Sequence, residues 1–105
     1  MNVRSLPSAE DDVIAVGDRL DSEQAGYGAR FAADFEKAIV AIGVNPRMYA
    51  RTEDGPDEPE NREYFIARFE YRVIYAIWRD EAVIVAVLHA RHRPNSWQGR
   101  LTELD

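Results

Sequence analysis

The first half of the chain has apolar residues at the spacing of amphipathic helices. Val13, Val16 and Leu20 fall at positions i, i+3 and i+7, which places them on one helical face. A second series between Phe31 and Ile42 repeats helical spacing after a break that contains two glycines. The pattern therefore predicts two helices, the first opening at Ser8 and the second at about Ala29, which form an antiparallel hairpin.

The second half changes to runs of β-branched and aromatic residues. Three such runs, at about 63–69, 71–79 and 82–90, are separated by very short breaks. Consecutive strands with such short connections form an antiparallel meander. With a short β-compatible segment before the helices, the pattern predicts one α+β domain over residues 1–105. In it, an N-terminal strand and a helical hairpin pack on an antiparallel sheet with a three-strand C-terminal meander.

Three segments raise further expectations. The stretch from about 51 to 61 has acids, prolines and a glycine and no other apolar residue, which predicts a mobile acidic loop with nothing to bury. The tail 94–105 carries Trp97, whose indole either folds back onto the sheet or lies in a partner interface. The uncharged run Val83–Leu88 predicts an open sheet edge or apolar groove that a partner peptide would fill.

Charge and composition reduce the number of function classes that fit this chain. The net charge is −6, and residues 1–59 hold 6 basic against 12 acidic residues. A nucleic-acid binder usually has a clearly basic domain, so this balance argues against broad affinity for nucleic acids. The absence of cysteine excludes disulfides and thiolate chemistry. Because no apolar run is long enough to cross a bilayer, we expect a cytoplasmic protein with no membrane partner and no cofactor.

The only two histidines lie where the last predicted strand ends. Histidine is the usual general acid or base, and a neighbouring arginine can stabilise the charge of a phosphoryl transition state. We therefore take His92, Arg91 and His89 as candidate catalytic residues. His89 shares its strand parity with valines, which favours a hydrogen-bonded place at the edge of the core as the alternative to a catalytic role. Two histidines without a neighbouring acid or cysteine do not predict a metal site.

The remaining candidates are arginines and one tryptophan. A guanidinium binds phosphate or carboxylate through its planar fork, so it suits nucleic acid and an acidic protein partner equally. Candidate phosphate- or partner-binding residues are Arg62, Arg72, Arg93 and Trp97. For each strand arginine, a solvated or salt-bridged structural role is the alternative.

Several of these residues together resemble a known family. The matching segments are Tyr71-Arg72-Val73-Ile74-Tyr75, the strand Val83–His89, and Arg91-His92-Arg93-Pro94 with Trp97, together with Arg62 at the start of the meander. In these positions and in the order of its elements, the chain is similar to the RelE/ParE superfamily of bacterial toxins, in particular the plasmid-stabilisation branch. The clear match covers residues 62–97.

The resemblance implies the toxin component of a type II toxin–antitoxin system, which arrests growth and is neutralised by a protein antitoxin. Members of the superfamily either cleave mRNA on the ribosome or inhibit DNA gyrase, and both targets remain open here. Such toxins are usually basic, whereas this chain is acidic and has a single lysine, Lys37. A decayed, non-toxic interaction module with the same fold is therefore the alternative function.

Overall fold

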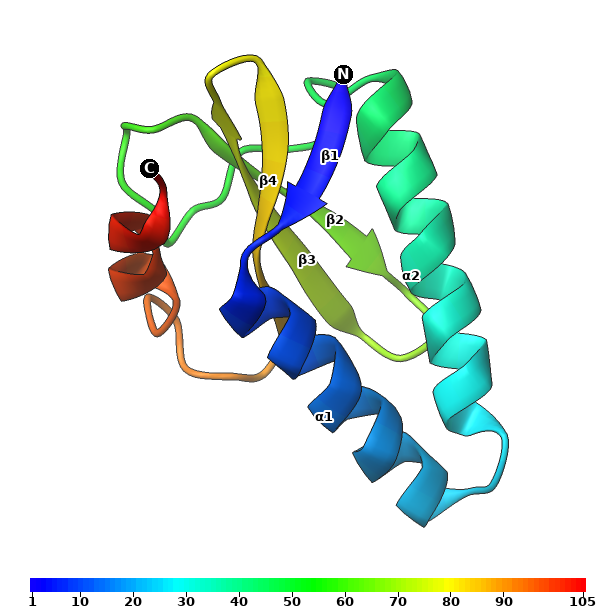
Figure 1. Cartoon of the computed structure of the whole chain (residues 1–105). Helices are drawn as coiled ribbons and strands as arrows, with labels where there is room; N and C mark the ends of the chain where they lie inside the picture. Colours follow the sequence, from blue (N-terminus) through cyan, green and yellow to red (C-terminus); the bar gives the residue numbers. More distant parts are fainter.

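The computed structural model describes residues 1–105. Two long helices and a twisted sheet form two layers, and a short 3₁₀ helix lies near the C-terminus (Figure 1). The elements in chain order are β1 (Asn2–Ser5), α1 (Pro7–Glu23), α2 (Tyr27–Val44), β2 (Asn61–Ile66), β3 (Tyr71–Trp78), β4 (Glu81–His89) and η1 (Gln98–Glu103). The predicted α+β class, helical hairpin and meander are confirmed.

The sheet is mixed. Its strand order is β1-β4-β3-β2, in which β2, β3 and β4 are the antiparallel meander and β1 pairs in parallel with β4. The predicted antiparallel sheet therefore holds for the meander only. The run Val83–Leu88 lies in β4, which β1 pairs as far as Ile84, so the expectation of an open edge is wrong for this first part of the run.

The helical hairpin covers one face of the sheet. Phe31 of α2 packs edge-on against Tyr71 of β3, with 5.3 Å between ring centroids. Because side chains alternate along a strand, Tyr71, Val73 and Tyr75 lie on this helix-covered face and are fully buried. Arg72 points to the opposite face, which the loop after α2 and the C-terminal tail cover in part.

Beyond the end of β1, side chains instead of a neighbouring strand form hydrogen bonds with the backbone of β4. The register of β1 reaches only Ile84, and a β-bulge leaves Val85 without a partner on β3. Beyond that point, Asp12 of α1 accepts a hydrogen bond from the Val87 N–H at 2.9 Å. Arg100 of the tail donates to the Val85 carbonyl at 3.1 Å and pairs with Asp12 at 2.6 Å. This α1–tail clasp binds backbone groups that a longer β1 would otherwise pair.

The starts of both helices differ slightly from the sequence pattern. α1 begins at Pro7, because a proline is well accommodated at the first helical position, where its missing N–H is not needed. Ser8, the predicted opening residue, instead donates its hydroxyl to Glu103 of η1. α2 begins at Tyr27, directly after Gly26, which adopts a left-handed conformation with φ of 93°. Neither helix has an apolar stretch that would let it cross a membrane.

Candidate functional site

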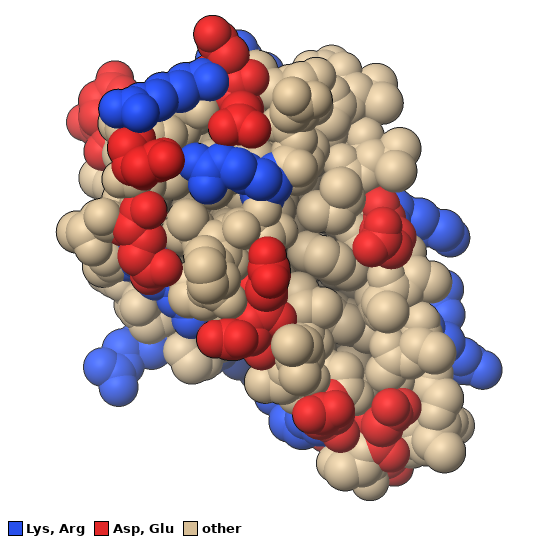
Figure 2. Space-filling model, in the orientation of Figure 1, with Lys and Arg blue, Asp and Glu red and all other residues tan.

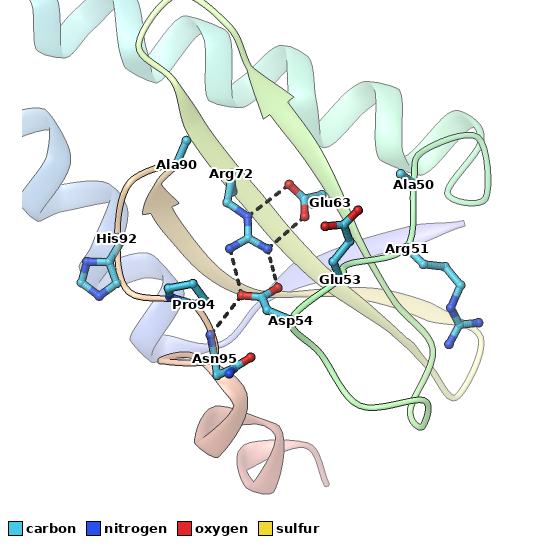
Figure 3. Close-up of a pocket in the computed structure, with 10 residues that line it drawn as sticks. All are labelled: Ala50, Arg51, Glu53, Asp54, Glu63, Arg72, Ala90, His92, Pro94 and Asn95. Atoms are coloured by element: carbon cyan, nitrogen blue, oxygen red, sulfur yellow. Dashed lines mark hydrogen bonds and ion pairs between the residues drawn. The ribbon is translucent and has the colours of Figure 1, made fainter.

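A hollow of about 680 Å³ lies on the sheet face that the helices leave uncovered (Figure 3). The loop after α2, strands β2 and β3, and the turn after β4 all contribute to it. Its lining residues are Ala50, Arg51, Glu53, Asp54, Glu63, Arg72, Ala90, His92, Pro94 and Asn95.

Arg72 forms the floor of this hollow. Its guanidinium binds both carboxylate oxygens of Asp54, at 2.6 and 3.0 Å, and both of Glu63, at 2.9 and 3.1 Å. The side chains of Arg72 and Asp54 are only 14% and 12% exposed, so solvent screens the pair weakly. Hydrogen bonds to Asp54, partly offset by burial, raise the pKa of Arg72 above its usual value.

Asp54 also binds the C-terminal tail. The Trp97 indole N–H donates to its carboxylate at 2.9 Å, and the backbone N–H of Asn95 does so at 3.1 Å. The Gln98 side chain donates to the Asp54 backbone carbonyl. The hydrogen bond from Arg72 is the main reason why the pKa of Asp54 lies well below its usual range. Asp54 therefore joins the loop, the sheet and the tail as an anion at neutral pH.

The acidic loop is packed and hydrogen-bonded, which contradicts the expectation that it has nothing to bury. Asn61, at its end, is 2% exposed and donates to the carbonyls of Pro56 and Pro59 at 2.8 and 2.7 Å. Thr52 donates to the Asn61 side-chain oxygen. Gly55 lies so close to Asn61 and Trp97 that a Cβ atom would clash with both. Polar contacts, rather than apolar burial, hold this loop against the sheet.

The hollow is acidic in balance. Asp54 and Glu63 share one guanidinium, and Glu53 forms neither a hydrogen bond nor an ion pair. Arg51 points out of the hollow and donates to the Asp57 carbonyl at 2.8 Å (Figure 3). More broadly, Figure 2 shows acidic side chains spread over the molecule from the loop and tail to α1, with most basic side chains at the margins of this view.

The three residues of the turn after β4 are exposed. Arg91, His92 and Arg93 make no side-chain hydrogen bond or ion pair, and the His92 imidazole lies at the rim of the hollow, away from Arg72 (Figure 3). Of the predicted arginines, only Arg91 and Arg93, its neighbours in sequence, lie beside His92. Arg72 is already bound to carboxylates.

His89 lies on the other face of the sheet. Its ring packs edge-on against Tyr71 at 5.2 Å between centroids, next to residues of α1. Its Nδ1 accepts the backbone N–H of Arg91 at 3.1 Å. This arrangement matches the alternative of a hydrogen-bonded residue at the edge of the core, and it separates His89 from His92.

Two further candidate residues have structural contacts. Arg62 of β2 binds Glu60 at 2.8 Å and the Tyr49 carbonyl at 2.6 Å, so its guanidinium ties the start of β2 to the preceding loop. Trp97 is 1% exposed and folds back onto the sheet, which is the first of the two positions expected for its indole. Its indole is part of the core and does not present a surface to a partner.

The acidic half of this site does not follow from the sequence patterns. These place Asp54 and Glu53 in a solvated loop and Glu63 at the start of a strand, with no functional role. One signal was available: Arg72 alternates with the buried Tyr71 and Val73, so it projects onto the second sheet face, where a partly buried guanidinium needs carboxylate partners. No three of the chain's His, Asp and Glu side chains are grouped so that they could hold a metal ion.

Comparison with known proteins identifies the family. The family model described as ParE toxin of the type II toxin–antitoxin system parDE matches residues 3–94. A solved structure described as a chromosomal ParDE TA system from P. aeruginosa has a TM-score of 0.71 and 13% identity, over 85% of this chain and 95% of that one. No curated protein matches this sequence.

The structural match shows the fold, and the family match runs from within β1 to beyond the end of β4. Both agree with the resemblance that the strands Tyr71–Tyr75 and Val83–His89 indicated. The chain belongs to the ParE toxin family and is the toxin component of a type II toxin–antitoxin system.

Proposed function

We propose that this toxin acts in the cytoplasm by binding to DNA gyrase and inhibiting it, without catalysing a reaction itself. The observation that carries the proposal is the ion-pair network of the hollow, in which Asp54 and Glu63 occupy the guanidinium of Arg72. A surface arranged in this way is suited to a protein target rather than to RNA phosphates.

Ribosome-linked RNA cleavage has a different geometric requirement. A general acid or base must lie within hydrogen-bond reach of the reacting hydroxyl, beside cations that are free to stabilise the phosphorane charge. Here His89 and His92 lie on opposite sheet faces, and Arg62 and Arg72 are both bound to carboxylates. The carboxylates in the hollow would also repel an RNA backbone.

One observation favours the nuclease alternative. Arg91, His92 and Arg93 are consecutive, exposed and without side-chain partners, so they are free to contact RNA. If they do, His92 is the acid/base candidate and the two arginines are the phosphate ligands.

The test uses toxin released from its antitoxin complex by denaturation and refolding. Purified gyrase is incubated with relaxed plasmid and increasing amounts of toxin, and the supercoiled product is measured. We expect supercoiling to fall with toxin concentration. In parallel, mRNA ends are mapped on translating ribosomes after induction in a bacterial host, and we expect the mRNA to stay intact.

The variants His92→Ala and Arg91→Ala decide between the two mechanisms. Gyrase inhibition should be unchanged in both, whereas a nuclease would lose about 10²–10⁴-fold of its rate with His92→Ala. New mRNA ends that disappear in His92→Ala would overturn the gyrase proposal. Normal growth with soluble, folded toxin would instead favour the non-toxic interaction module.

A further inference from the structure

A second hollow, of about 240 Å³, lies between the helical hairpin and the sheet and is separate from the acidic hollow of Arg72. The second half of α1, the start of α2, the turn between β2 and β3, and the end of β4 all contribute to it. Part of its wall is aromatic, because Tyr27 packs edge-on against Phe69 with 5.6 Å between ring centroids. A hollow of this size accepts one side chain of a partner rather than a helix or a strand.

Tyr71 lines this hollow and carries a polar group that has no partner. It is 2% exposed, and its hydroxyl forms no hydrogen bond within the protein. A buried polar group without a partner is costly and is rare in native proteins, so this hydroxyl calls for a partner from outside the chain. Tyr75 on the same strand shows the usual arrangement, since its buried hydroxyl donates to the Pro46 carbonyl.

Two further donors next to Tyr71 are unused. The Nδ1 of His89 accepts the Arg91 N–H, so the neutral ring carries its hydrogen on Nε2, which has no partner. The Arg19 guanidinium lies over the Tyr71 ring, 5.4 Å from its centroid, and forms no ion pair. Because Arg19 is exposed and exposed side chains change rotamer rapidly, it can move aside and uncover the hydroxyl.

Two carboxylates at the rim of the hollow are unused acceptors. Glu23 of α1 and Glu70 of the β2–β3 turn are exposed, and neither side chain forms a hydrogen bond or an ion pair. The other arginine of the hollow, Arg68, is held by Asp34 at 3.3 Å.

This balance of groups decides which ligand fits. A ligand carboxylate would meet two free carboxylates against the single free guanidinium of Arg19, so it would be repelled. A lysine or arginine has only donors and would leave the donors of Arg19 and His89 without an acceptor. The hollow therefore suits a neutral group that both accepts and donates hydrogen bonds.

We propose that this hollow binds the carboxamide of an asparagine or glutamine side chain of the protein antitoxin. The oxygen of a carboxamide accepts two hydrogen bonds, and its NH₂ group donates two. The oxygen accepts from the Tyr71 hydroxyl and the His89 Nε2–H. The NH₂ group donates to Glu23 or Glu70, and the methylene groups contact the aromatic wall. The proposal rests on membership of a toxin–antitoxin family, which implies an antitoxin partner, and does not depend on the target of the toxin.

The first measurement compares thermal melts of the free toxin and two variants. Tyr71→Phe should leave Tm unchanged or raise it, because it removes a hydroxyl that has no partner. Tyr75→Phe is the matched control on the same strand and should lower Tm by about 4–8 °C, as for the loss of one hydrogen bond. Equal falls in both variants would show that the Tyr71 hydroxyl is already satisfied in the free toxin, which would overturn the proposal.

The second measurement is calorimetry with the antitoxin encoded by the reading frame adjacent to this one. Tyr71→Phe should weaken binding about fivefold or more, because it leaves a buried amide without a partner, whereas Tyr75→Phe should change it by less than about twofold. The asparagines and glutamines of the antitoxin are then replaced one at a time by alanine. One replacement should weaken binding to the wild-type toxin about fivefold or more, but to Tyr71→Phe by less than about twofold.

The amide is tested against its acid at the same antitoxin position. Replacing that asparagine or glutamine by aspartate or glutamate should weaken binding further, because Glu23 and Glu70 repel the new carboxylate. An acid that binds as well as the amide would overturn the assignment of a carboxamide. Unchanged binding in Tyr71→Phe would overturn the proposal, as would losses that simply add for every antitoxin amide.

Two outcomes would assign the hollow to another occupant and so reject the proposal. If Tyr71→Phe binds antitoxin normally but inhibits gyrase less, the hollow contacts the target. If light scattering shows that the free toxin is a dimer that Tyr71→Phe converts to a monomer, a second copy fills the hollow.

Discussion

Asp54 connects the three segments that meet on the sheet face away from the helices, namely the acidic loop, strand β3 and the C-terminal tail. It binds Arg72 from the sheet and Trp97 and Asn95 from the tail, while its own backbone belongs to the acidic loop. Removing its carboxylate leaves a partly buried guanidinium and an indole N–H short of acceptors. Such uncompensated groups are costly, because they have already lost their water.

We expect Asp54→Ala to lower the free energy of unfolding by about 3 kcal/mol, as for one partner removed from a buried ion pair. For a domain of this size that corresponds to a fall in Tm of well over 10 °C, at about 4–8 °C per kcal/mol. Asp57→Ala, on an exposed residue of the same loop, is the control and should be neutral. Denaturant and thermal unfolding curves measure both, and equal curves would show that the network contributes little.

The same carboxylate predicts an acid-sensitive stability. The pKa of Asp54 in the folded protein lies below the unfolded value of about 3.9, because Arg72 donates to its anion. Its contribution is therefore fully present above about pH 4 and is lost as the pH falls towards the lower, folded pKa. The stability difference between the wild type and Asp54→Asn should accordingly shrink between pH 6 and pH 2.5. A constant difference across this range would contradict the assignment.

Residue roles were the least predictable part of the site. His89 and His92 both lie where the last predicted strand ends, but strand alternation and the turn after β4 separate their side chains. Conversely, Asp54 is 18 residues from Arg72 in sequence, and no local sequence pattern indicates that the two residues pair. Sequence patterns report periodicity within an element, whereas this network depends on where a loop crosses a sheet.

At the scale of elements, the loop between α2 and β2 acts as a cover for the sheet. Its bonds through Asn61, Asp54 and Thr52 tie it to β2, β3 and the tail. Composition alone suggested a solvated connection, since the loop lacks apolar residues. The packing was missed because its partners are polar groups from distant parts of the chain.

Deletion of residues 53–57 should therefore destabilise the domain strongly, whereas loop-closure entropy alone would predict almost no change. The deletion removes Asp54 and the Gly55 contact with Trp97, so we expect a fall in Tm of 10 °C or more, on the basis of the same ion pair. Replacing Asp57 and Glu58 by serine keeps the loop length and is the control. A deletion variant that melts within a few degrees of the wild type would show that the loop is dispensable.

The α1–tail clasp is a second link between elements. Asp12 and Arg100 bind each other and also the backbone of β4 at Val87 and Val85. In a double-mutant cycle with Asp12→Ala and Arg100→Ala, we expect a coupling energy of about 0.5–3 kcal/mol, because the residues share one network. Urea unfolding of the four proteins gives this value, and additive effects would argue against a functional clasp.

For the whole molecule, the order of elements and the fold class followed from periodicity, and the strand boundaries agreed to within a few residues. The parallel pairing of β1 with β4 could not be predicted, because a strand of four residues carries no signal of its direction or of its neighbour. Family membership was predictable from the motifs of the meander.

The overall charge leads to a prediction about nucleic acids. With a net charge of −6 and carboxylates in its main hollow, the free toxin should not retard duplex DNA in a mobility-shift assay, even at about 50 mM salt, where electrostatic binding is strongest. Any effect on gyrase would then come from contact with the enzyme. Retardation of DNA by the toxin alone would contradict this expectation.

The pairing of β1 with β4 has a consequence for synthesis of the toxin. The ribosome makes β1 well before its only strand partner, residues 81–84, which follows about 80 residues later in the sequence. The loop between α2 and β2 is likewise held in place by the hydrogen bond from Trp97 to Asp54, and Trp97 is synthesised later still. A nascent chain can thus form its helices early, whereas the sheet forms only after β4 has been synthesised. Prematurely terminated products that lack β4 should be unfolded and harmless, so the cell meets an active toxin only after translation has passed β4 and the tail.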